Sequence, residues 1–159
     1  MVEMTKKAHR SRITQLSMFL ENKLGALRRV LTILEEAHVR ACALSILDAA
    51  DHAVARMVVN RPGPAREALQ TAGYSVFETE VLGVALPGKE QEDFEVGRLL
   101  SALLVSEINV KYLYALIIQV DGRPVIAVRV DDMDAAARVL TKAGLTLVGQ
   151  EDIDWGEPV

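Results

Sequence analysis

The sequence predicts an α+β fold made of two similar halves, each a ferredoxin-like βαββαβ unit with an antiparallel sheet and helices on one face. Two stretches of the first half return about 70 residues later, which is too long for a solenoid repeat of roughly 20–50 residues. The matching residues are Leu27, Val30 and Leu34 with Val96, Leu99 and Leu103, and Leu69, Ala72 and Gly73 with Leu140, Ala143 and Gly144. The second match is two residues further apart than the first, so we expect two extra residues in the second half, where a hairpin turn lies.

The pattern of apolar and turn-forming residues predicts each element of the first half. A strand ends at the polar turn Glu21-Asn22-Lys23, and the apolar stripe from Leu24 to Leu34 has the spacing of a helix. Two strands meet at Ala50-Asp51, Pro62 suits the first turn of a second helix, and Gly73 ends that helix. The expected elements are strands at 12–20, 39–49, 52–60 and 75–80, and helices at 24–37 and from 61 to the glycine at 73.

The second half repeats this order. Pro87-Gly88 ends its first strand, and Asp121-Gly122 is a strong signal for a hairpin turn. The expected elements are strands at 81–86, 108–120, 124–130 and 146–151, helices at 94–106 and 132–143, and a tail at 152–159. No linker separates the halves, so we expect domains at 12–80 and 81–153, with their sheets packed side by side.

Composition excludes several classes of function. A net charge of −4 disfavours nucleic acid as a partner, because phosphate binding rests on clustered Lys and Arg. The single cysteine, Cys42, excludes an intrachain disulfide and any CxxC metal or redox motif. No apolar stretch approaches the roughly 20 residues of a membrane span, and no signal-peptide pattern is found. We therefore expect a cytoplasmic protein with no metal, no cofactor and no membrane partner.

The stretch from Phe19 to Leu34 resembles the opening of ACT domains, which are small modules that bind amino acids and regulate metabolic enzymes. The run Glu21-Asn22-Lys23-Leu24-Gly25 and the helix after it are similar to the strand–loop–helix signature of the family. The second signature, a Gly-Ile-Asn-Ile-like entry to strand two, resembles Glu107-Ile108-Asn109-Val110. The resemblance covers both halves, residues 13–153, and is greatest to stand-alone tandem ACT proteins with no attached enzyme.

This resemblance implies an amino-acid site at the loop between the first strand and the first helix. In ACT pairs the loop of one domain faces the start of strand two of its neighbour, so the ligand is expected at the interface of the two domains. Free N–H groups in a first helical turn favour a carboxylate, glycine allows close backbone approach, and asparagine both donates and accepts hydrogen bonds. The expected ligand-binding residues are Asn22, Leu24, Gly25, Ala26, Leu27, Ile108 and Asn109. Ordinary turn and helix-entry chemistry remains an alternative reading of Asn22 and Gly25, and a polar residue at the start of a strand remains an alternative reading of Asn109.

The opposite pairing of the halves departs from the family pattern. Arg40 replaces the asparagine that the second half keeps, while Gln91 and Phe94 replace the asparagine and the glycine of the first loop. A bulky ring obstructs close approach of a ligand to the backbone. We therefore expect a second, weaker site at these residues and one amino acid bound per chain.

The function predicted from the sequence is regulation by a bound free amino acid, in a homodimer that partners with a metabolic enzyme. An ACT-like pair that binds no ligand and serves as a protein–protein interaction subunit is the alternative. An enzyme is disfavoured, because no arginine-bearing phosphate loop of the acylphosphatase type follows the first strand and no nucleophile–base pair stands out. An RNA-binding sheet requires aromatic side chains and a basic face, which the 4% aromatic content and the negative charge disfavour.

Overall fold

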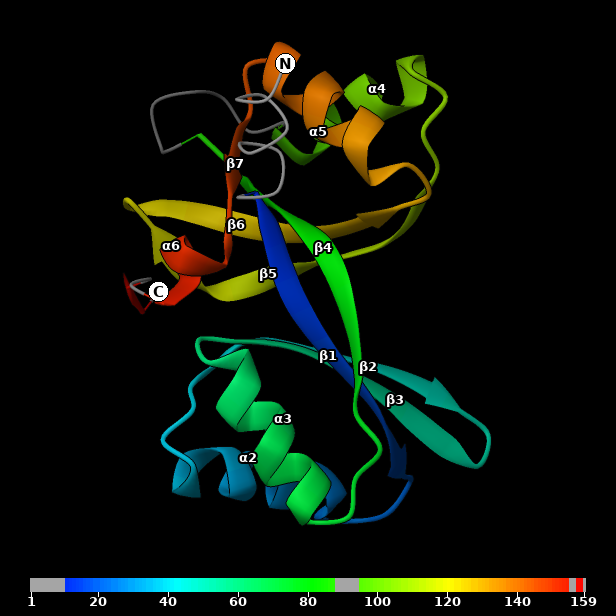
Figure 1. Cartoon of the computed structure of the whole chain (residues 1–159). Helices are drawn as coiled ribbons and strands as arrows, with labels where there is room; N and C mark the ends of the chain where they lie inside the picture. The colour runs from blue at the N-terminus through cyan, green and yellow to red at the C-terminus, as the bar shows by residue number, and fades with distance from the viewer. Residues whose placement is uncertain (1–10, 88–94, 155–156, 159) are drawn as a thin grey trace. The chain divides into compact units, whose positions relative to one another are not determined.

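The computed structural model describes residues 11–87, 95–154 and 157–158 of the chain (Figure 1). Contacts between residues divide the chain into two compact units. The N-terminal unit is Thr14–Thr79, and the C-terminal unit runs from Glu80 onward and includes Arg12 and Ile13. The divisions therefore fall inside two strands. The domain bounds of 12–80 and 81–153 remain a proposal.

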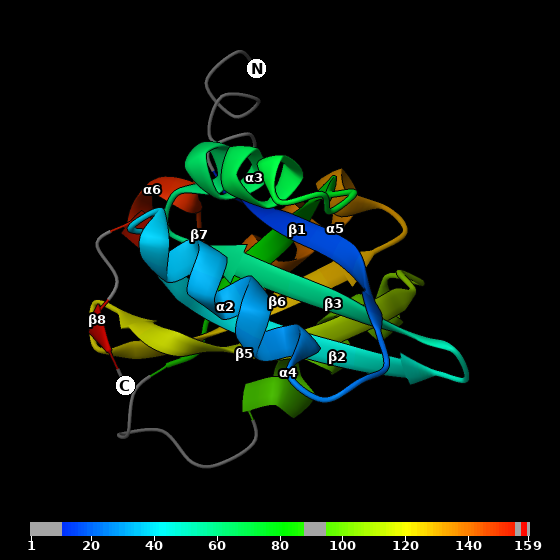
Figure 2. The same cartoon turned by 90° about the horizontal axis from the view of Figure 1, so that it is seen from below.

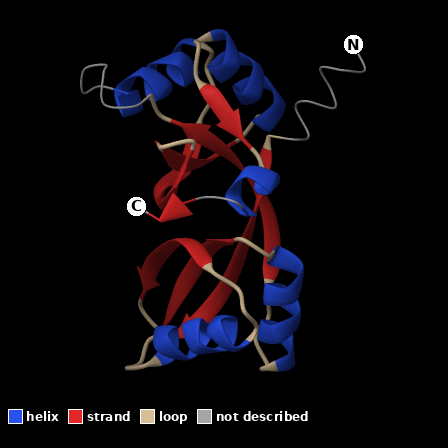
Figure 3. Cartoon of the chain, turned by 90° about the vertical axis from the view of Figure 1, so that its left-hand side faces the viewer, coloured by secondary structure: helices blue, strands red, loops and turns tan. Residues whose placement is uncertain are grey.

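The N-terminal unit is an antiparallel sheet with two helices on one face (Figure 3). Its elements are β1 (Arg12–Glu21), α2 (Ala26–Glu36), β2 (Ala41–Ala49), β3 (His52–Val59), α3 (Pro62–Thr71) and the start of β4 (Phe77–Ala85). β3 lies between β1 and β2, with Val54 opposite Phe19 on one side and Leu47 on the other. The helices α2 and α3 lie side by side (Figure 2), and Met57 of β3 and Leu69 of α3 are fully buried in the core beneath them.

The C-terminal unit repeats this arrangement. Its elements are the rest of β4, α4 (Glu95–Val105), β5 (Val110–Val120), β6 (Arg123–Val130), α5 (Met133–Lys142), β7 (Thr146–Val148), α6 (Gln150–Asp154) and β8 (Glu157–Pro158). Its strands follow the order β7-β4-β6-β5-β8, each antiparallel to its neighbours. The side chains of Leu99, Leu103 and Leu140 form the core between the sheet and helices α4 and α5. The predicted α+β class and the βαββαβ order of both halves are confirmed.

The helix ends of the two units match residue for residue. The first helix of each unit is followed by a residue in the left-handed conformation, His38 at φ 55° and Glu107 at φ 56°. The second helix is followed by a left-handed glycine, Gly73 at φ 95° and Gly144 at φ 81°. After all four residues, the next N–H donates to a carbonyl in the last turn of the helix, as in a Schellman cap. The repeat in the sequence is therefore a repeat of backbone geometry as well.

The two extra residues of the second half lie in a strand rather than in a turn. Both hairpins turn on two residues, Ala50-Asp51 and Asp121-Gly122. The register of β5 against β6 shifts by two residues between Ala115 and Gln119. The prediction of an insertion at the hairpin turn is wrong, because an irregularity in β5 absorbs the extra residues and leaves the turn unchanged.

The end of the chain also differs from its predicted form. The strand expected at 146–151 stops at Val148, and α6 follows it where a strand end and a tail were expected. The carboxylate of Asp152 accepts the N–H of Gly149 at 2.8 Å, and Ile153 is fully buried. The hydrogen bond of Asp152 and the burial of Ile153 hold this short helix in place. The helix is too short to leave a periodic pattern in the sequence. Trp155 lies outside the described residues.

Candidate functional site

The loop that joins β1 to α2 is held by a glycine. α2 begins at Ala26, two residues later than expected, so Leu24 belongs to the loop and its side chain is fully exposed. Gly25 precedes the helix with φ 85°, a left-handed conformation that strains any residue with a Cβ. The conformation of the loop therefore favours glycine at this position, and the role of Gly25 in ligand binding stays a prediction.

The first turn of α2 has the character of an anion site. No side chain caps this end of the helix, and its first turn contains no acidic residue. The N–H groups of Leu27 and Arg28 are among the donors that an α-helix cannot satisfy internally. Such donors, together with the helix dipole, favour a negatively charged group. The arrangement suits a carboxylate from outside the helix.

Asn22 makes a contact within its own unit. Its Nδ2 donates to Oδ1 of Asp48 on β2, at 3.3 Å. This hydrogen bond ties the loop to the hairpin of β2 and β3, and it uses only one of the several donor and acceptor positions of the amide. Both the turn-forming and the ligand-binding interpretation of Asn22 remain compatible with this contact.

The other predicted residues lie in separate places. Ile108 is buried in the core of the C-terminal unit. The Asn109 carbonyl oxygen accepts the Asp131 N–H at 3.2 Å, and the Asn109 N–H donates to Oδ1 of Asp131 at 3.1 Å. In the N-terminal unit, Arg40 is held by Asn60 through the equivalent bonds, with the Arg40 N–H donating to Asn60 Oδ1 at 2.8 Å. The two strand entries are therefore built alike. Gln91 and Phe94 lie outside the described residues.

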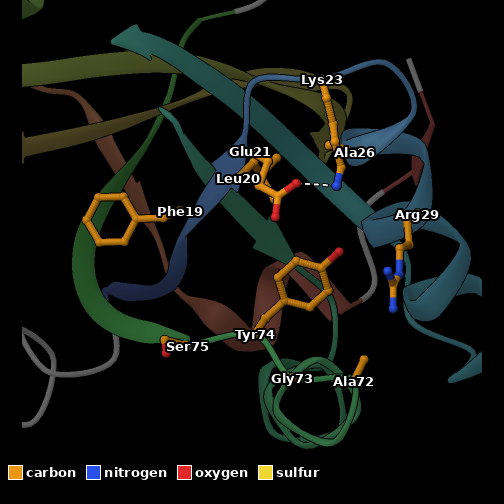
Figure 4. Close-up of a pocket in the computed structure, with 10 residues that line it drawn as sticks. All are labelled: Phe19, Leu20, Glu21, Lys23, Ala26, Arg29, Ala72, Gly73, Tyr74 and Ser75. Atoms are coloured by element: carbon orange, nitrogen blue, oxygen red, sulfur yellow. Dashed lines mark ion pairs between the residues drawn. The ribbon is translucent and has the colours of Figure 1, made fainter. Parts of the chain in front are cut away.

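A cavity of about 370 Å³ lies beside the same loop (Figure 4). It opens between the end of β1, the start of α2 and the turn that follows α3. Its lining residues are Phe19, Leu20, Glu21, Lys23, Ala26, Arg29, Ala72, Gly73, Tyr74 and Ser75. Of the residues predicted from the sequence, only Ala26 contributes to this lining. The structure thus adds a candidate site that sequence reasoning missed.

Charges of both signs surround this cavity. Glu21 and Lys23 form an ion pair at its rim. The hydrogen bond and the charge of Lys23 hold the pKa of the Glu21 carboxyl below its ordinary value of 4.5, and the charges of His52 and Arg29 lower it further. Among the residues that the structure describes, the Arg29 guanidinium has no hydrogen bond or ion pair within contact distance, and neither has the Tyr74 hydroxyl. The cavity therefore offers one ionised carboxylate and one unpaired guanidinium.

Two further findings concern metal-ligating side chains and membrane-spanning helices in the described part of the chain. There, no three His, Cys, Asp or Glu side chains gather closely enough to hold a metal ion. None of the helices described is long and apolar enough to cross a membrane.

Comparison with known proteins identifies a family. Residues 11–155 match the family described as ACT domain pair. The chain is similar to protein BT0572 from Bacteroides thetaiotaomicron, with 27% identity and a TM-score of 0.80 over 91% of this chain and 96% of that one. It shares its fold with the ligand-free regulatory subunit of aspartate kinase from Thermus thermophilus, at 13% identity and a TM-score of 0.59 over 82% and 91% of the two chains. No match was found among curated proteins.

Proposed function

The chain belongs to the ACT domain pair family, and we propose that it is a regulatory protein that binds a free amino acid and has no catalytic activity of its own. The family is a regulatory one, related to amino-acid-binding domains, and the fold of both units agrees with it. The observation that carries the proposal is the start of α2. Its first turn has no side-chain cap and no acidic residue, and the left-handed Gly25 that precedes it is exposed.

We propose that the ligand carboxylate binds at the Asn22–Leu27 loop, with one amino acid per chain. Asn109 is proposed to contribute from the second half, and Arg40, Gln91 and Phe94 to form the weaker site. These assignments come from the resemblance of the sequence to ACT domains. The uncapped helix turn supports the first of them physically.

A thermal-shift screen of the twenty amino acids tests the proposal, because a ligand that binds only the folded state raises its apparent stability. Calorimetry of a hit should then show one site per chain. Loss of a hydrogen bond to a charged ligand group costs roughly 1.5–3 kcal/mol, so Asn22→Ala and Asn109→Ala should each weaken binding about ten- to a hundredfold. Gln91→Ala should have little effect.

A matched control separates ligand contact from loop support. Asp48→Ala removes the partner of Asn22 within the chain and leaves the asparagine in place. If Asn22 binds ligand directly, Asp48→Ala should change affinity far less than Asn22→Ala. Equal losses in the two variants would assign Asn22 to loop support, and two equal sites per chain would contradict the proposed asymmetry.

The alternative is an ACT pair that acts only through a protein partner, such as a metabolic enzyme. This reading gains if no amino acid raises the melting temperature of the chain. Turnover in a broad hydrolase and phosphatase panel that one point substitution abolishes would refute the non-catalytic assignment.

We also propose that the chain forms a homodimer. Among the described strands, β2 pairs only with β3, which leaves one of its edges free. β2 contains neither lysine nor proline, the residues that commonly protect an edge strand, and its Ile46 and Leu47 are exposed. A second copy of the chain is therefore the expected partner of this edge.

A further inference from the structure

The cavity beside Arg29 differs in kind from the anion site at the start of α2. It lies within the N-terminal unit and is lined from three places in the sequence: the end of β1, the face of α2 that carries Arg29, and the turn after α3. Its volume of about 370 Å³ falls within the roughly 300–1,000 Å³ of small-molecule sites. The apolar part of its lining includes the buried Leu20 and the half-buried Ala26.

The duplicated half shows what the matching arginine contacts in its own unit. Arg98 occupies the position in α4 that Arg29 occupies in α2. Its Nη2 donates to the carbonyl oxygen of Ala143 at 2.5 Å, at the end of α5. The equivalent carbonyl belongs to Ala72, which lines the cavity, and Arg29 makes no such bond. Arg98 thus bonds the end of the second helix of its unit. Among the described residues, Arg29 has no equivalent bond, so its guanidinium can bind a ligand.

A second substitution in the repeat points the same way. Tyr74 follows the left-handed Gly73, and Leu145 follows the left-handed Gly144. Leu145 is buried in the core of its unit. Tyr74 is only half-buried, and it brings a hydroxyl group to the lining of the cavity, as Figure 4 shows. An apolar contact in one half therefore corresponds to a hydrogen-bonding group at the cavity in the other.

From this divergence we propose that the cavity binds a small α-amino acid, with its carboxylate on the Arg29 guanidinium and its ammonium group on the Glu21 carboxylate. Guanidinium and carboxylate form paired, charge-assisted hydrogen bonds with a defined planar geometry. The Tyr74 hydroxyl supplies a further donor or acceptor, and the ligand side chain lies toward Leu20 and Ala26. This assignment rests on the proposed amino-acid-binding function, and it places that one ligand in the cavity instead of at the Asn22–Leu27 loop.

The charge state of the site supports a zwitterionic ligand. The pKa of the Glu21 carboxyl lies below its ordinary value, chiefly because of Lys23, so the carboxylate is ionised at neutral pH. Lys23 already pairs with this carboxylate, while Arg29 has no such partner among the described residues. A ligand with a carboxylate alone would place its negative charge near the Glu21 carboxylate. In a zwitterionic ligand, the ammonium group pairs with the Glu21 carboxylate and offsets this repulsion.

The test compares two arginines on one helix. Arg29→Met removes the proposed carboxylate partner, and Arg28→Met removes the same charge from a residue whose side chain bonds Glu35 instead. For the amino acid that gives the largest thermal shift, calorimetry should show affinity weakened about ten- to a hundredfold by Arg29→Met and unchanged by Arg28→Met. Tyr74→Phe should weaken binding less than Arg29→Met does.

An analogue of the ligand tests the carboxylate contact from the other side. The carboxamide of the same amino acid lacks the carboxylate charge, so it should bind the parent chain much more weakly than the amino acid does. For Arg29→Met, the amino acid and its carboxamide should bind with similar affinity. Arg29 is exposed, so the variant is expected to fold, and circular dichroism checks this.

The outcomes separate this inference from the proposed function. Binding that survives Arg29→Met and Tyr74→Phe but falls in Asn22→Ala overturns the cavity and keeps the proposed loop site. Binding that falls in Arg29→Met and is unchanged in Asn22→Ala and Asn109→Ala supports the cavity and removes the loop site. Failure of all twenty amino acids to bind the parent chain overturns both.

Discussion

Glu21 and Lys23 show how a short loop sets the charge of a candidate site. The two side chains form an ion pair at the end of β1, whose last residue is Glu21, and both residues line the cavity. Both are exposed, so their pair contributes little to the free energy of unfolding. Its effect on the protonation of Glu21 is direct, since Lys23 is the largest cause of the lowered pKa.

Replacing Lys23 should restore an ordinary carboxyl at position 21. In Lys23→Met the pKa of Glu21 should rise toward 4.5, because the hydrogen bond and the nearby positive charge are lost. A pKa that is lowered by folding stabilises the fold above the unfolded-state pKa, and this contribution is lost as the pH falls through the folded value. NMR titration of the side-chain carboxyl carbon measures the change, with Arg28→Met as a control. An unchanged titration in Lys23→Met would contradict the assigned cause.

Gly83 is fixed by close packing within the C-terminal unit. A Cβ at this position would lie 2.6 Å from Cγ2 and 2.9 Å from the carbonyl oxygen of Val148, and even closer to Ile13. Ile13 is fully buried, and Gly83 pairs with Val148 in the ladder of β4 and β7. No side chain fits without movement of the strand.

Gly83→Ala should therefore destabilise the chain. Overpacking of a close-packed core costs typically about 1–3 kcal/mol, and here a backbone oxygen is among the atoms that must move. Gly97→Ala is the matched control, because a Cβ there meets nothing within 4 Å and the residue lies in α4. That variant should be neutral or more stable by about 0.5–1 kcal/mol. Urea denaturation of the two variants and the parent compares them, and equal stabilities would contradict the packing argument.

At the scale of single residues, the sequence pointed to the loop that contains Gly25 and missed the cavity. Gly25 was predicted to allow close approach of a ligand, and its left-handed φ of 85° adds a second reason for glycine, which is the turn itself. Arg29 and Tyr74 are far apart in the sequence and line one cavity only because the end of α3 lies near the start of α2. A signal was present in the repeat, where Arg29 and Arg98 match while Tyr74 and Leu145 differ. Nothing in the sequence said that this difference borders a cavity.

The helices of the two units begin in different ways. α5 follows Asp132, whose Oδ1 accepts the N–H of Ala135 at 2.9 Å. α3 follows Arg61, which is the equivalent residue of the first half and makes no side-chain cap; Pro62 occupies the first turn instead. Proline removes one unsatisfied N–H and presets the backbone, whereas aspartate satisfies an N–H directly.

Asp132→Ala should cost about 1 kcal/mol of unfolding free energy, which is typical of a lost N-cap. Arg61→Ala should cost almost nothing, because no side-chain bond is removed at that cap. Both values follow from chemical denaturation of the full chain. A loss in Arg61→Ala as large as that in Asp132→Ala would show that the hydrogen bond is not the cause.

At the scale of elements, periodicity and turn signals predicted the long helices and both hairpins. They did not predict α6, because five residues leave too short a pattern and the helix depends on the burial of Ile153. Nor did they place the two extra residues in β5, since strand register is set by pairing between strands. Both failures concern features that tertiary contacts decide.

The architecture of the whole molecule was the most predictable level, because the same order of elements occurs in both halves of the sequence. An element that is ambiguous in one half gains support from its counterpart, as Gly73 does from Gly144. The free edge of β2 differs from the equivalent edge in the second half. There the corresponding strand, β5, pairs with β8 at Ile118 and Gln119. The chain therefore covers one of two equivalent edges with its own C-terminal residues.

Association through β2 should be detectable by sedimentation. The parent chain is expected at twice its mass of 17.4 kDa, and Leu47→Lys should shift it to the monomer by placing a charge on the free edge. Leu104→Lys is the control, because Leu104 is even more exposed but lies on α4. A monomeric parent at tens of micromolar, or a dimer that persists in Leu47→Lys, would contradict this interface.

The position of Ile13 affects whether one unit of the chain can be exchanged for another by recombination. Ile13 precedes the whole N-terminal unit in the chain, yet it belongs to the C-terminal unit, close to Gly83. Arg12 beside it pairs with Asp134 at 2.5 Å. A gene segment that starts at Glu80 would encode a unit without these two residues, and a segment that ends at Thr79 would carry them away from their partners. The two copies can thus diverge at single positions, as Tyr74 and Leu145 have done, but exchange of either copy at the boundary of the units would separate Ile13 from Gly83.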